Sequence, residues 1–85
     1  MPVSSMDVIE RIARVIAARV LSSNAEGEDA SASAEVDRVW PEFRADALAI
    51  LKTLREPDEI MARAGDVAIW QQMIEASLRE SAPTL

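Results

Sequence analysis

Residues 33–54 read SAEVDRVWPEFRADALAILKTL, and this stretch decides the fold class. Its large apolar residues recur at three- and four-residue steps, the spacing of one face of an α-helix. Ser33 is the expected N-cap. The helical phase of the apolar residues continues through Pro41, so we expect one helix over about 34–55 with a kink at Pro41. The alternative is a separate helix that starts at Pro41. The apolar face consists of Val36, Val39, Trp40, Phe43, Ala47, Ile50, Leu51 and Leu54.

A second helical pattern precedes this stretch and predicts a helix over about 5–21. Ser4 or Ser5 is its expected N-cap. Glu10 and Arg14 form an i,i+4 pair in the favourable order, so we expect the arginines of this helix to pair with neighbouring acids and not to form a binding patch. The apolar stripe of this helix is formed by Val8, Ile9, Ile12, Val15, Ile16 and Val20.

Two further helices are predicted in the C-terminal part. A short one covers about 58–64 and ends at Gly65, which we expect in the left-handed conformation of a helix C-cap. Asp66 is the expected N-cap of a helix over about 67–80. The chain has only two glycines, and no stretch shows the alternation of a strand. The sequence therefore predicts an all-α fold, a small helical bundle of three main helices and one short helix.

Length and charge indicate how the chain is organised. Eighty-five residues allow a single domain, 1–85. We expect a mobile acidic loop at 22–33 and a frayed tail at 81–85. The net charge is −6, and no basic residue lies between Arg19 and Arg38. Five of the acidic residues fall in that gap, so the rest of the chain is nearly neutral: Glu26, Glu28, Asp29, Glu35 and Asp37.

Composition excludes several classes of function. The chain has no cysteine and no histidine, and therefore lacks a thiol nucleophile, the usual general base and the commonest metal ligands. We expect no enzymatic activity, no catalytic residues, no metal and no cofactor. The negative charge argues against direct nucleic-acid binding, because affinity for phosphates comes from Lys and Arg. No apolar run is long enough to cross a membrane, so we expect a cytoplasmic protein.

Three phrases of the sequence resemble a group of small uncharacterised bacterial proteins that are often encoded in prophage-like regions. The phrases are IERIARVI at 9–16, DALAILKTLREPDEIMARAGD at 46–66 and IWQQMIEASL at 69–78. The shared pattern is an opening IERVAR-type helix, an alanine-rich helix ending in LREP or LRTP, an AG turn and a terminal W..MI.AAL helix. It falls here on 9–14, 45–57, 64–65 and 70–78. The resemblance implies a compact helical module and a phage context, and it assigns no functional residue.

The function that these observations favour is protein binding, through a partner protein or through self-association. The first helix offers a seam for a homodimer at Ile9, Ile12, Ile16 and Val20. Both tryptophans are expected in the core. The helix of Trp70, however, has an apolar arc wide enough for a core and a partner, which makes Trp70 a candidate interface residue. The alternative is an acidic phage-encoded inhibitor that blocks a nucleic-acid-binding host protein.

Overall fold

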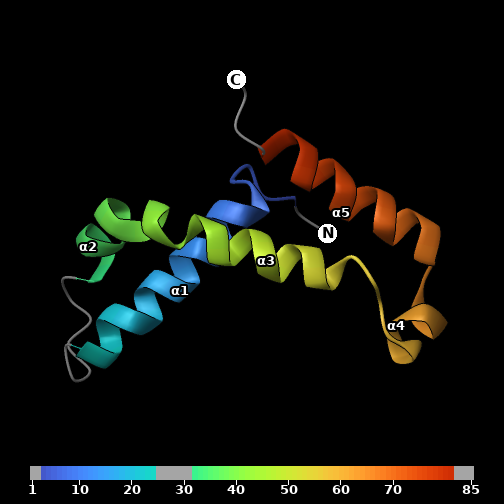
Figure 1. The fold of residues 1–85 in the computed structure, drawn as a ribbon, viewed down its shortest axis with the longest axis horizontal. Helices are drawn as coiled ribbons and strands as arrows, with labels where there is room; N and C mark the ends of the chain where they lie inside the picture. Colours follow the sequence, from blue (N-terminus) through green and yellow to red (C-terminus); the bar gives the residue numbers. More distant parts are fainter. Residues whose placement is uncertain (1–2, 25–31, 82–85) are drawn as a thin grey trace. The chain divides into compact units, whose positions relative to one another are not determined.

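The computed structural model describes residues 3–24 and 32–81, and within them every regular element is a helix. The expected all-α class is confirmed. The chain divides into two compact units, Met1–Ala47 and Leu48–Leu85. In chain order the elements are α1 (Val8–Asn24), α2 (Ala32–Val39), the 3-10 helix η1 (Trp40–Phe43), α3 (Arg44–Leu54), α4 (Glu59–Ala64) and α5 (Val67–Ser81), as drawn in Figure 1.

Helix α1 begins at Val8, three residues after the predicted start. Its N-cap is Asp7, whose Oδ1 accepts a hydrogen bond from the backbone N–H of Glu10 at 2.8 Å. The predicted caps, Ser4 and Ser5, are therefore wrong. The Ser4 hydroxyl instead accepts from the backbone N–H of Met6 and closes a local turn before the helix. Asp7 takes the capping role because its carboxylate reaches the third helical N–H and also suits the positive end of the helix dipole.

The core of the first unit lies where α1 contacts α2 and η1. Two alanines of α1, Ala13 and Ala17, are fully buried. Alanine side chains let neighbouring backbones approach closely, so the buried face of α1 is centred on small residues. Val15, which the apolar pattern assigned to the stripe, is 61% exposed and lies outside this face. The buried apolar residues of the unit are Ile9, Ala13, Ala17, Val36 and Ala47.

Around Pro41 the chain changes from α-helix to 3-10 helix, and no non-helical residue separates the two. Helical residues follow one another from α2 through η1 into α3, but residues 40–43 form a 3-10 turn with Pro41 near its start. Proline has no N–H for the carbonyl four residues earlier and disfavours α geometry at Trp40, which explains the interruption. The predicted N-cap Ser33 is wrong, since α2 begins at Ala32 and still has Glu35 in its first turn to suit the dipole.

In the second unit, two aspartates start two helices. Asp58 Oδ1 accepts from the backbone N–H of Met61 at 2.9 Å, and Asp66 Oδ1 accepts from that of Ile69 at 3.1 Å, as expected for Asp66. Gly65 between them has φ −159° and ψ −164°, so the predicted left-handed cap is wrong. The chain leaves α4 in an extended conformation because Asp66 must follow at once as an N-cap, a position that favours the β region.

The second unit buries few large side chains. Among its described residues only Leu51 and Ile74 are buried large apolar residues, at 1% and 8% exposure. Ile50 and Leu54, which belong to the predicted apolar face of residues 33–54, are exposed. Of the residues of this unit that the structure describes, six large apolar side chains are exposed: Ile50, Leu54, Ile60, Val67, Ile69 and Met73. Much of the apolar surface of this unit is therefore open to solvent.

The predicted loop and tail lie largely outside the described residues. Of the loop at 22–33, residues 22–24 continue α1 and 32–33 begin α2, while 25–31 are outside the description. Of the tail at 81–85, only Ser81 is described, as the last residue of α5. Within the part of the chain that the structure covers, every helix is too short or too polar to cross a bilayer.

Candidate functional site

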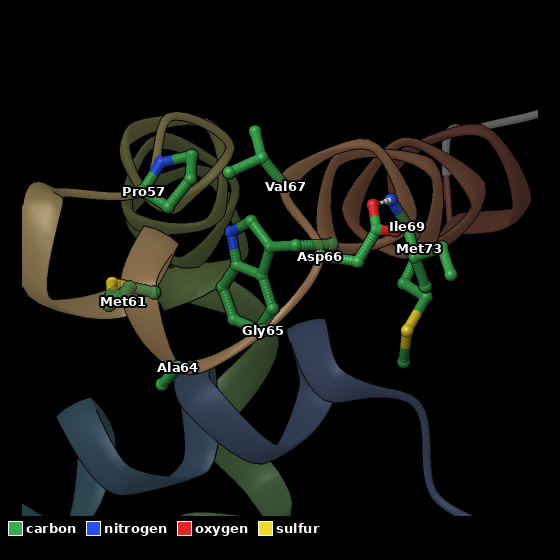
Figure 2. Close-up of a pocket in the computed structure, with 9 residues that line it drawn as sticks. Pro57, Met61, Ala64, Gly65, Asp66, Val67, Ile69 and Met73 are labelled. Carbon is green, nitrogen blue, oxygen red and sulfur yellow. Dashed lines mark hydrogen bonds between the residues drawn. The ribbon is translucent and has the colours of Figure 1, made fainter.

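The second unit contains an apolar groove of about 320 Å³ between α4 and α5. This volume is at the lower end of the range found for ligand pockets, roughly 300–1,000 Å³. Because the groove is small, it suits one or two apolar side chains better than a cofactor. Figure 2 shows the nine lining residues: Pro57, Met61, Ala64, Gly65, Asp66, Val67, Ile69, Trp70 and Met73.

Helical spacing brings these residues together. The α4 side comes from Met61 and Ala64, which are three residues apart on one face of the helix, and from Pro57, which precedes the helix. The α5 side is built in the same way, and in Figure 2 Met61 and Met73 lie at opposite ends of the lining residues. Met73 is 63% exposed. Methionine side chains are flexible and polarizable, so two of them give the groove walls that adapt to different apolar shapes.

Trp70 is the largest side chain in the wall and is held by a hydrogen bond. Its indole Nε1–H donates to the backbone carbonyl of Leu54 at 2.7 Å. Leu54 is the last residue of α3, where a carbonyl has no partner within its own helix. The indole therefore satisfies the end of α3 and fixes its own orientation, while the half-buried ring remains part of the groove. No local spacing predicts this bond, because the two residues belong to different helices.

The groove carries almost no charge. Asp66 is the only ionisable residue among those that line it, and its carboxylate caps α5. The ion pair on α4, between Arg63 Nη1 and Glu59 Oε1 at 3.9 Å, is made by two exposed side chains that do not line the groove. The arrangement therefore suits apolar contact, and it brings no pair of ionisable groups together for acid–base chemistry.

The five predicted interface residues are divided between the two units. On α1, Ile9 is 1% exposed, Ile12 and Ile16 are half-buried, and Val20 is 40% exposed. The α1 stripe is therefore not presented as one open face, since its first member is buried. Trp70 lies in the second unit and lines the groove. The other lining residues were not predicted as interface residues, although Ile69 and Met73 lie on the same helix as Trp70 and within one turn of it.

A second cluster, centred on Arg14, ties α1 to α2 and η1 in the first unit. The expected pair with Glu10 is present, with 2.8 Å between Arg14 Nε and Glu10 Oε2. Arg14 Nη1 also lies 2.5 Å from Asp37 Oδ1, and its guanidinium lies over the Trp40 ring. The hydrogen bonds to Asp37 and then to Glu10 raise the pKa of Arg14. We interpret the cluster as a structural tie, because each of its polar groups is paired within the chain.

Comparison of the chain with protein-family models, curated proteins and solved structures finds no significant match. The functional argument therefore depends on the geometry of the groove.

Proposed function

We propose that this protein is a small, non-enzymatic binding module whose α4–α5 groove receives apolar side chains of a protein partner. The observation that carries the proposal is the combination of shape and chemistry at the groove. It is concave, it is framed by the short helix α4 and the first two turns of α5, and its rim presents the exposed side chains of Ile69 and Met73. Apolar helix faces are commonly recognised by grooves of this kind.

A half-buried tryptophan strengthens the proposal. Trp70 presents a large apolar ring in the groove at little conformational cost, because its indole N–H is already bonded to Leu54. Tryptophan is enriched among residues that dominate binding energies, particularly where the ring is surrounded by apolar contacts. The exposed apolar side chains around it are a second sign, since large apolar patches on soluble proteins often mark interaction sites.

The test is selection of helical peptides from a displayed library, followed by fluorescence anisotropy with synthetic peptides. We expect peptides with apolar residues at i, i+3 or i+4 and i+7, and affinity that survives high salt because the contact is apolar. Met73→Glu should weaken binding by about tenfold or more, which corresponds to about 1.4 kcal/mol. Val15→Glu is the matched control: it places the same charge at an α1 position that is 61% exposed, against 63% for Met73.

Two outcomes would contradict the proposal. One is the absence of any selected peptide whose binding responds to Met73→Glu. The other is binding that depends on charge and disappears at high salt, which would favour the inhibitor of a nucleic-acid-binding protein. Among the described residues, Asp37 is paired with Arg14 and Glu35 with Arg38, so two of the five clustered acids are already neutralised by the chain itself. These pairs favour the apolar mode of binding.

A further inference from the structure

We infer that the occupant of the α4–α5 groove is a second copy of this chain, so that the second units of two molecules pair across a two-fold axis. This inference rests on the proposed function and names its partner. It moves the dimer contact from the α1 stripe to α4 and α5.

The first argument is the apolar surface that the second unit leaves uncovered. A chain of 85 residues has a small core, and small domains often gain stability from disulfides, metals or oligomerisation. The chain has no cysteine and no histidine, which removes the first means and weakens the second. Of the described residues of this unit, two large apolar side chains are buried and six are exposed. Association with the same surface of a second molecule would cover these six exposed side chains.

The second argument is that this surface contains both halves of a self-complementary contact. A two-fold interface uses the same patch on both molecules, so the patch must supply the projecting side chains and the hollow that receives them. Here the hollow is the groove, and the projecting side chains are Ile69 and Met73 on its rim and Ile60, which is exposed next to Met61. Each copy can therefore offer its rim to the groove of the other.

The third argument is charge. In a two-fold contact, a charged residue of the patch can lie close to the same residue of the other molecule. The two like charges then repel each other. The chain has a net charge of −6, yet the groove has a single ionisable residue, Asp66, whose carboxylate is held by the N-terminus of α5. A partner with acidic anchor residues would find no opposite charge in this lining, and one with basic anchor residues would find only the carboxylate of Asp66, which already caps α5. The near-neutral groove thus favours pairing with an identical surface over pairing with a charged partner.

The experiment is sedimentation equilibrium of the full chain over about 5 to 500 μM, with the wild type and three variants. We expect a monomer–dimer equilibrium in the wild type. Met73→Glu should raise the dimer dissociation constant by about tenfold or more, whereas Val15→Glu should change it by less than about twofold. Val20→Glu tests the α1 seam and should also leave the constant within about twofold. Circular dichroism of each variant checks that the helices are kept, and Ile69→Gln replaces Met73→Glu if that variant loses helix.

Three results would overturn the inference. They are a wild type that stays monomeric over the whole range, an assembly larger than a dimer, and a dimer that Val20→Glu weakens as much as Met73→Glu does. The proposed function has a separate readout. The chain could be monomeric and still bind selected helical peptides in a manner sensitive to Met73→Glu. That result would refute the dimer but support the proposed binding function. A chain that neither dimerises nor binds peptides refutes both.

Discussion

Arg14 of α1 lies over the indole ring of Trp40 of η1, with 5.5 Å between the guanidinium carbon and the ring centroid. The same guanidinium bonds to Glu10 on its own helix and to Asp37 on α2. A planar cation with five N–H donors can meet two carboxylates and an aromatic face at once, which a lysine ammonium cannot do. Arg14 therefore joins three elements of the first unit through one side chain.

Replacing Arg14 by lysine should lower the stability of the protein although the charge is kept. We expect Arg14→Lys to reduce the midpoint of urea denaturation, and Arg14→Gln to reduce it further. Arg11→Lys is the matched control, because Arg11 is an exposed arginine of the same helix. Equal shifts in Arg14→Lys and Arg11→Lys would show that the three contacts contribute nothing beyond helix propensity.

The pH dependence of this difference follows from the pKa of Arg14. Its carboxylate partners raise that pKa in the folded state above the ordinary value of arginine. A raised pKa stabilises the fold at every pH below the unfolded value, and this contribution is lost only as the pH rises through the folded value. Arg14 is therefore expected to keep its contribution over the whole range from neutral to about pH 10, well below the ordinary pKa of arginine. Denaturation of the wild type and Arg14→Gln at neutral and mildly alkaline pH should show a constant difference.

The three aspartate caps make a second prediction, since each accepts a bond from the backbone N–H three residues on. Replacing Asp7, Asp58 or Asp66 by alanine should cost about 0.5–2 kcal/mol of unfolding free energy, and replacement by asparagine much less. Ser4→Ala is the control and should stay within about 0.5 kcal/mol, because the Ser4 bonds lie before the helix. A larger loss in Ser4→Ala than in Asp7→Ala would restore the serine cap that the sequence had suggested.

Gly65 supports a third prediction, because its backbone is extended and a Cβ built on it meets no atom within 4 Å. Gly65→Ala should stabilise the protein by about 0.4–1 kcal/mol through the lower entropy of the unfolded chain. Gly65→Pro should destabilise it, because proline requires φ near −65° and the observed φ is −159°. Urea denaturation compares the two variants with the wild type. A loss of stability in Gly65→Ala would indicate that this position needs a conformation open only to glycine.

The accuracy of sequence-based prediction differs with the range of the interaction involved. Periodicity, together with Asp66 as the cap of α5, predicted α4 and α5 almost to the residue, and the Glu10–Arg14 pair followed from i,i+4 spacing. Periodicity failed where tertiary packing decides: Val15 fits the α1 stripe in a helical projection, yet the buried face is centred on Ala13 and Ala17. Asp37 and Trp40 could not be linked to Arg14 from sequence, because no local spacing relates residues on separate helices.

The hydrogen bond from Trp70 to Leu54 gives the last prediction. Trp70→Phe keeps an aromatic ring in the groove but removes the donor, so the terminal carbonyl of α3 loses its partner at 2.7 Å. A hydrogen bond contributes about 0.5–1.5 kcal/mol net, and this range sets the expected loss of unfolding free energy. The loss should lie towards the lower end, because water can reach a half-buried site.

Amide and indole hydrogen exchange followed by NMR provides a second measurement. The indole N–H of Trp70 should exchange more slowly than that of Trp40, for which the described residues show no acceptor. Equal exchange of the two indoles, together with unchanged stability in Trp70→Phe, would mean that the bond does not hold the groove wall in solution. The groove would then have to form as its occupant binds.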